Sequence, residues 1–166
     1  MSEPPGFRDF VHDRQAMLLR SAWLLTGDWH AAEDLVQVAL VKVWPKWTRI
    51  TGRGDPDAYV RRVLVTTYLT RRRRRWHGEV SSDRLPDSPD PGREDGLAAV
   101  ELRDQVTRIL GTVSPQQRVV LMLRFYQDLS VEQTASILGC STGTVKSQTS
   151  KALARLTSPG MTEGIR

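Results

Sequence analysis

The stretch L-S-V-E-Q-T-A-S-I-L-G-C-S-T-G-T-V-K-S-Q-T-S-K-A-L-A-R-L, residues 129–156, decides the fold of the second half of the chain. It predicts two helices joined by a tight turn. Ser130, with Gln133 three residues later, forms a capping box that starts the first helix. Gly139 ends that helix, because glycine adopts a left-handed backbone without steric cost.

The second helix of this pair begins beside two possible caps, Ser141 and Thr142. Apolar residues then recur at helical spacing, which predicts one face turned toward a core. That inner face is predicted to carry Val145, Ala152, Leu153 and Leu156.

The spacing of three residues identifies the kind of helix pair. Ala135 is small enough for two crossing helices to approach closely, Gly139 follows four residues later, and Val145 follows ten residues later. These offsets are typical of a DNA-binding helix-turn-helix. An ordinary helical hairpin is the alternative, but it has no physical reason to keep all three offsets.

The outward face of the second helix carries hydroxyl, amide and ammonium groups, which suit base edges and phosphates. No carboxylate lies between Leu138 and Leu156, so nothing there would repel a phosphate backbone. The predicted contacts of this face are Thr144, Lys146, Ser147, Gln148, Ser150 and Lys151.

The composition allows one ordinary domain or two small ones in 166 residues. The net charge of +5 and a sequence pI of about 9.9 favour a polyanionic partner. A single cysteine, Cys140, excludes an internal disulfide. No apolar leader or membrane-spanning run is present, so the sequence predicts a soluble, cytoplasmic protein without membrane insertion.

The charge is distributed unevenly along the chain. Residues 1–77 hold 14 Lys and Arg against 8 Asp and Glu, residues 78–97 hold 2 against 6, and residues 98–166 hold 8 against 5. The acidic middle is rich in Pro, Asp, Ser and Gly and offers little apolar surface to bury. We therefore predict an all-α protein with two small helical domains, residues 7–77 and 98–157, joined by a flexible acidic linker over residues 78–97.

Three helices are predicted in the first domain. An apolar stripe from Phe7 to Leu25 marks the first, and Asp28 caps the second, which runs to Trp44. Residues 45–55 are predicted as a loop, and Asp55-Pro56 starts the third helix. The apolar arc of the second helix is broad, so that helix is either central in the bundle or presents its surplus face to a partner protein.

Five consecutive arginines, Arg71 to Arg75, end the third helix. At about 100° per residue they point all around the axis, so this end must project beyond the core. The run is either a solvated helix end or a phosphate-binding surface. Trp76 beside it either stacks on a base or covers the core.

The second domain adds two helices before residue 129. One is predicted from Leu97 to Leu110, and the next starts at Ser114-Pro115 with a capping glutamine, Gln117. The apolar residues predicted to support the helix-turn-helix are Val119, Val120, Met122, Leu123 and Phe125.

The sequence gives little support to the alternative of an enzyme acting on nucleic acid. Adjacent carboxylates such as Glu33 and Asp34 diverge by about 100° on a helix and do not converge on a metal. The three histidines have no ligand spacing, and no glycine-rich phosphate loop is present. The sequence predicts no catalytic residue, no metal and no cofactor.

Three segments together resemble a known family. A-E-D-L-V-Q (residues 32–37), A-Y-V-R-R-V (residues 58–63) and the stretch of residues 129–147 occur in the order found in minimal two-domain sigma factors. The chain resembles the extracytoplasmic-function group (group 4) of sigma-70 factors, in particular its sigma-E-like members. It departs from that pattern at Val38, where the family has an acidic residue, and at Gln148, where arginine is frequent.

The resemblance implies a non-catalytic factor that directs promoter-specific transcription initiation. Its implied partners are RNA polymerase core, through the beta and beta′ subunits, double-stranded and melted promoter DNA, and an anti-sigma factor. The first domain, of three to four helices, would bind polymerase and recognise the −10 element; the second, of four helices, would recognise the −35 element. The alternative is a stand-alone helix-turn-helix regulator, which leaves the first domain unexplained.

Residue roles follow by position from the matching motifs. The implied polymerase contacts are Asp34, Leu35, Gln37 and Trp44. The implied −10 contacts are Tyr59, Arg61, Arg62, Arg71, Arg72, Arg73, Arg74, Arg75 and Trp76, and the −35 contacts are the six residues of the outward helix face given above.

Overall fold

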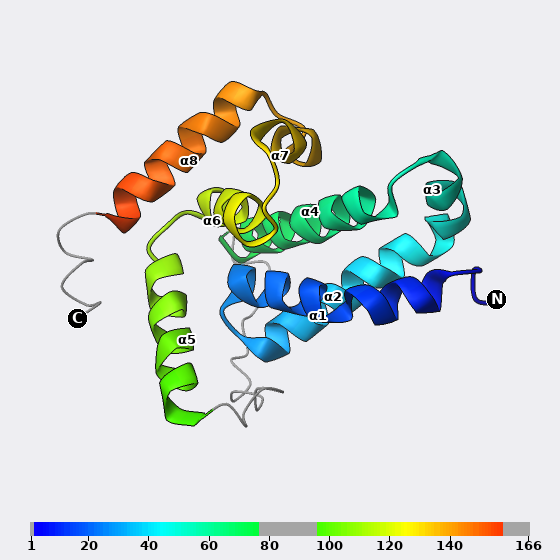
Figure 1. The fold of residues 1–166 in the computed structure, drawn as a ribbon, viewed down its shortest axis with the longest axis horizontal. Helices are drawn as coiled ribbons and strands as arrows, with labels where there is room; N and C mark the ends of the chain where they lie inside the picture. Colours follow the sequence, from blue (N-terminus) through cyan, green and yellow to red (C-terminus); the bar gives the residue numbers. More distant parts are fainter. Residues whose placement is uncertain (1, 77–95, 158–166) are drawn as a thin grey trace. The chain divides into compact units, whose positions relative to one another are not determined.

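The computed structural model describes residues 2–76 and 96–157 (Figure 1). The chain divides into two compact units, Met1–Arg84 and Leu85–Arg166. Helices make up the regular structure of the described residues, which contain no strand. This agrees with the predicted all-α, two-domain class. The linker predicted over residues 78–97 lies outside the described residues except for its last two positions, which belong to a helix.

The first unit contains α1 (Phe7–Thr26), α2 (Trp29–Val43), the 3-10 turn η1 (Trp44–Lys46), α3 (Trp47–Arg53) and α4 (Pro56–Trp76). Gly27 ends α1 in a left-handed conformation, and Asp28 then accepts a hydrogen bond from the backbone N–H of His30. In Figure 1, α2 turns back alongside α1 at this break. The predicted break between the first two helices is thus confirmed, because Gly27 ends α1 and Asp28 caps the start of α2.

Helix α2 is the central helix of this unit, because it packs against both α1 and α4. Five of its residues are buried, which accounts for most of its broad apolar arc. Val41 is the exception, with 72% of its surface exposed. Buried residues of the surrounding core include Leu18, Ala22, Leu25, Leu35, Ala39, Val43, Val60, Leu64 and Tyr68.

The loop predicted over residues 45–55 is wrong over most of its length, because α3 forms there. Trp47 and Ile50, one turn apart, are both buried, and the Thr51 hydroxyl donates to the Trp47 carbonyl at 3.1 Å. Burial against the neighbouring helices therefore outweighs the weak local preference of this glycine- and threonine-containing segment. Only Gly54 and Asp55 lie between α3 and α4.

The second unit contains α5 (Gly96–Leu110), α6 (Pro115–Leu121), the wider π-turn η3 (Met122–Tyr126), α7 (Val131–Leu138) and α8 (Thr142–Leu156). Both predicted capping boxes are present. Gln117 N–H donates to Ser114 Oγ at 3.2 Å, and Gln133 N–H donates to Ser130 Oγ at 3.0 Å. Ser141, rather than Thr142, caps α8.

Two apolar clusters hold the helices of the second unit together. Val120, Ala135 and Val145 form one, in which Val145 is 1% exposed, and Val113, Leu121 and Ala152 form the other. Gly139 has φ 65° and ends α7, so the turn needs the left-handed conformation expected there. The predicted helix-turn-helix packing is confirmed.

Two residues predicted to face this core are exposed instead. Leu153 is 41% exposed, because it lies about 80° around the helix from Val145, whereas Ala152 lies within about 20° of it. Phe125 is 58% exposed. It lies in η3, whose wider turn shifts the residues after Met122 around the axis relative to a regular helix.

Candidate nucleic-acid interface

The exposed face of α8 is set by the two residues that are buried beneath it, Val145 and Ala152. Around the axis, Ser147 and Ser150 lie roughly opposite Val145, and Lys146 and Lys151 lie to either side of them. All four side chains are exposed. The helix therefore presents a row of hydroxyl and ammonium donors away from its own core.

The other two predicted α8 contacts differ from these four. Gln148 is half-buried, since it lies about 60° from Val145 and so close to the packed side. Thr144 is exposed, but its hydroxyl lies 2.9 Å from the hydroxyl of the cap Ser141. Arg155 is exposed four residues after Lys151 and continues its row. Sequence reasoning missed Arg155, although its spacing from Lys151 was a usable signal.

The exposed arginines of α4 project from the far end of the first unit's longest helix. Arg62 and Arg72 to Arg75 are exposed, whereas Tyr59, Arg61 and Arg71 are half-buried. The helix runs to Trp76, whose side chain is outside the described part of the structure. Four adjacent exposed guanidinium groups make this end strongly cationic.

One pair joins two residues that the sequence assigned to different partners. Arg71 Nη1 of α4 lies 2.8 Å from Asp34 Oδ2 of α2. Both side chains are substantially exposed, so the pair is expected to contribute less than about 1 kcal/mol to stability. The predicted polymerase and −10 surfaces therefore meet at this contact.

The other predicted polymerase contacts divide by burial. Asp34 and Gln37 are exposed and Trp44 is half-buried against the ring of Phe7, at 5.0 Å between centroids. Leu35 is 1% exposed and belongs to the core, so it cannot reach a partner in this conformation. Val41 was missed; it lies seven residues after Asp34 on the same helix face and is exposed.

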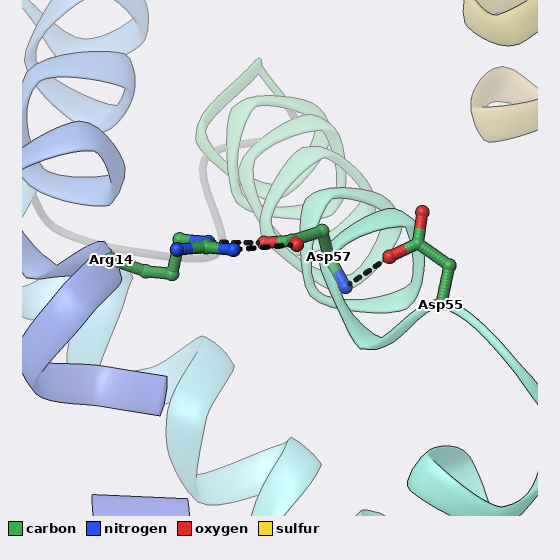
Figure 2. A network of polar contacts seen from close by, with 3 residues as sticks. All are labelled: Arg14, Asp55 and Asp57. Carbon is green, nitrogen blue, oxygen red and sulfur yellow. Dashed lines mark hydrogen bonds and ion pairs between the residues drawn. The ribbon is translucent and has the colours of Figure 1, made fainter. Parts of the chain in front are cut away.

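An ion pair holds the start of α4 to α1 (Figure 2). Arg14 Nε donates to Asp57 Oδ1 at 2.7 Å and Arg14 Nη2 to Oδ2 at 3.1 Å. Hydrogen bonding from Arg14 lowers the pKa of Asp57 against the opposing effect of burial, and the same bond raises the pKa of Arg14. The Asp57 N–H in turn donates to Asp55 Oδ1 at 3.0 Å.

A metal centre has no support in residues 2–76 and 96–157, where no three His, Cys, Asp or Glu side chains gather in a way that could hold a metal ion. No helix among the described residues is long and apolar enough to cross a membrane.

Family models match both units. The sigma-70 region 2 model matches residues 10–78, and the sigma-70 region 4 model matches residues 103–156. The chain is 41% identical over 157 residues to the RNA polymerase sigma-E factor of Streptomyces coelicolor, covering 94% of this chain and 86% of that protein.

The chain belongs to the sigma-70 family.

Other relatives place this sigma factor in the extracytoplasmic-function group. It is 31% identical over 152 residues to the ECF RNA polymerase sigma factor SigL of Mycobacterium tuberculosis, covering 89% of this chain and 84% of the relative. The sigma factor RpoE of Bartonella quintana, solved in complex with the anti-sigma factor NepR, matches with a TM-score of 0.72 at 28% identity, covering 92% of this chain and 95% of that one.

A second solved structure supports the fold. CnrH, in complex with the cytosolic domain of CnrY, matches with a TM-score of 0.67 at 19% identity, covering 91% of this chain and 84% of that one. The family and the named relatives show that this sigma factor directs transcription initiation. The stand-alone regulator is excluded as an alternative, because the first unit matches region 2 and is not an unrelated domain.

Proposed function

We propose that the exposed face of α8 recognises the −35 element in the major groove. The observation that carries this proposal is the burial of Val145 and Ala152, which fixes the rotation of α8 and turns its polar row outward. Hydroxyl and ammonium groups suit base edges and phosphates, and the N-terminus of a recognition helix is the part that enters the groove. The contacts proposed are Thr144, Lys146, Ser147, Gln148, Ser150 and Lys151, with Arg155 added from its exposure.

The −10 element is assigned to α3, α4 and the turn between them. Melting DNA requires a base to leave the stack, which costs a few kcal/mol unless the protein houses it. Exposed arginines at the end of α4 would hold the strand by its phosphates. Arg49 and Arg53 of α3, both exposed, add cationic groups on the side of the turn. The helix residues proposed for this role are Tyr59, Arg61, Arg62 and Arg71 to Arg75. Trp76 is also proposed, on the basis of its position next to Arg75 in the sequence.

Polymerase core is assigned to the exposed side of α2. Asp34, Gln37 and Val41 lie within two turns on one face, and Trp44 follows at its end. A single exposed valine is common on protein surfaces, so Val41 enters the proposed patch through its position on the same face as Asp34 and Gln37. The proposed partners on this surface are the beta and beta′ subunits of polymerase. We propose no catalytic step for this chain. An anti-sigma factor is a further proposed partner, since the similar sigma factor RpoE was solved in complex with one.

Run-off transcription tests the proposal as a whole. Purified core polymerase is assayed with and without this protein on genomic fragments, and the expected result is initiation at defined sites only when the protein is present. An absence of any protein-dependent transcript, with polymerase that is active on another sigma factor, contradicts the proposal.

Lys146→Ala and Lys151→Ala test the assignment of α8. Each is expected to weaken holoenzyme binding to its promoter in gel-shift titrations. Removal of a base contact should weaken binding by about 1–3 kcal/mol. Removal of a phosphate contact should mainly reduce, by about 1, the slope of log binding constant against log salt concentration. A promoter with a scrambled −35 element is the control, because only a lost base contact depends on that sequence. Unchanged affinity and salt slope for both variants would show that α8 does not touch the DNA.

A further inference from the structure

The turn between α3 and α4 is short and is built around one special backbone conformation. Gly54 has φ 146° and ψ −128°, a region that residues with a side chain rarely adopt. Apart from Gly54 and its two chain neighbours, no residue has a heavy atom within 4 Å of the position that a Cβ on Gly54 would occupy. The turn is therefore open to its surroundings at this point, and its conformation must be held from its two ends.

One face of α1 contacts both ends of this segment. Phe10 packs on Trp47, the first residue of α3, with 4.9 Å between ring centroids. Arg14, one turn further along α1, makes the two hydrogen bonds to Asp57, the second residue of α4 (Figure 2). The two side chains also touch one another, since the Arg14 guanidinium carbon lies 5.7 Å from the centre of the Phe10 ring.

The contact with Asp57 orients the turn as well as holding it. Two parallel hydrogen bonds between a guanidinium and a carboxylate define both the distance and the plane of the pair, which a single charge contact does not. The backbone N–H of the same residue is bound by Asp55, the last residue of the turn. Arg14, Asp57 and Asp55 thus form a continuous connection from α1 to the turn.

We propose that Arg14 is a positioning residue for recognition of the −10 element: through Asp57, it holds the α3–α4 turn in the conformation that receives an unstacked base. The proposal rests on the assignment of the −10 element to α3, α4 and this turn. Arg14 itself need not touch DNA. Base discrimination requires donors and acceptors held in one geometry, because a mobile turn can adapt to a wrong base.

The decisive measurement is base discrimination by the holoenzyme. A panel of promoter fragments carries each of the four bases at each −10 position of the non-template strand, with the −35 element unchanged, and open-complex formation is quantified. Because one mismatched base costs about 1–3 kcal/mol, or about 5- to 150-fold, Arg14→Met is expected to reduce discrimination at one or more −10 positions by about fivefold or more. Discrimination at the −35 element is expected to stay the same.

The matched control is Arg8→Met. Arg8 lies on the same helix and also makes a two-point contact with a carboxylate, at 3.1 and 2.8 Å, but its partner is Glu3 near the N-terminus. Wild-type discrimination is expected for this variant. If it lost discrimination as Arg14→Met does, the effect would belong to α1 stability and the proposal would be overturned.

Asp57→Asn and Arg14→Lys show whether the effect passes through the ion pair. Asp57→Asn should reproduce Arg14→Met, and the double variant should be no worse than either single one, since both remove the same connection. Arg14→Lys keeps the charge but not the two-point geometry, so it should recover only part of the discrimination. These two variants also carry the test if Arg14→Met fails to fold, which its thermal unfolding would reveal.

Three results would overturn the proposal: folded Arg14→Met and Asp57→Asn proteins with wild-type discrimination, additive losses in the double variant, or an equal loss at the −35 element. Failure of the proposed function looks different. In that case the wild-type holoenzyme itself would show no preference among −10 bases.

Discussion

Asp57 illustrates how a single residue serves two structural purposes. It stands in the first turn of α4, where a carboxylate is favoured by the helix dipole, and it accepts two hydrogen bonds from Arg14, 43 residues earlier. Only its first role follows from local sequence. The second joins α1 to the turn before α4 and lowers the pKa of this partly buried carboxylate.

The depressed pKa of Asp57 leads to a pH-dependent prediction. A carboxyl whose pKa is lower in the folded protein than its ordinary value of 3.8 stabilises the fold above that value, and the stabilisation is lost as the pH falls through the folded pKa. Because Arg14 is partly exposed, the pair should contribute no more than about 1 kcal/mol. Arg14→Met should therefore lower the unfolding free energy by up to this amount near pH 7, and by progressively less as the pH falls below 3.8 and through the lowered pKa of Asp57 in the folded protein.

Urea unfolding at a series of pH values measures this difference. Arg8→Met is again the reference, because its exposed pair should produce little difference at any pH. A loss in Arg14→Met that stays constant from neutral to acid pH would contradict the assignment of the effect to Asp57.

Helix α8 shows how one element combines a packing face with the exposed polar face proposed for DNA recognition. Val145, Ala152 and Leu156 lie within about 20° of one direction around the axis, and Leu153 lies outside that sector. The position of the buried face decides which polar residues point outward. Any change that rotates α8 would therefore change which residues lie on the face proposed to contact DNA.

The two faces of α8 predict different responses to truncation. Val145→Ala removes two buried methyl groups and is expected to lower the unfolding free energy by about 2 kcal/mol. Leu153→Ala removes more atoms but from an exposed position, so a change within about 0.5 kcal/mol is expected. Chemical denaturation of both variants checks this order. Equal destabilisation would mean that Leu153 packs in the core after all.

At the scale of the whole molecule, two compact units each carry their own core and their own charged surface. In the first, the α2 surface proposed for polymerase and the α4 arginines proposed for DNA meet at the Arg71–Asp34 pair. In the second, the proposed contact surface is the exposed face of α8. The proposed function thus assigns three separate surfaces to a chain of 166 residues. Both α2 and α8 have buried residues on one side and exposed residues on another.

Val41 supplies the prediction at this scale. Val41→Ser should weaken binding to polymerase core by about fivefold if the exposed side of α2 docks there and buries Val41, since burial of its methyl groups would contribute about 1 kcal/mol. Its stability should hardly change, because the side chain is exposed. Gln15→Ala, an exposed change on α1, is the control. Co-purification and fluorescence anisotropy with labelled protein measure the affinity, and wild-type binding by Val41→Ser would remove Val41 from the interface.

What the sequence determined by itself was local. Three features depend on residues only a few positions apart, and they could therefore be predicted from the sequence. They are the capping boxes at Ser130 and Ser114, the left-handed Gly139, and the spacing from Ala135 to Val145. The family resemblance extended this to function, because three such motifs occur in one order.

The tertiary structure decided what depends on residues distant in the chain. Helix α3 forms because Trp47 and Ile50 find buried places, Phe125 turns outward because of the wider turn at η3, and Leu35 is withdrawn from the predicted polymerase surface by the core. The pairs Arg14–Asp57 and Arg71–Asp34 span 43 and 37 residues. The local sequence pattern cannot predict such a pair, because each partner alone is indistinguishable from any other charged surface residue. The two residues come into contact only when the two helices pack together.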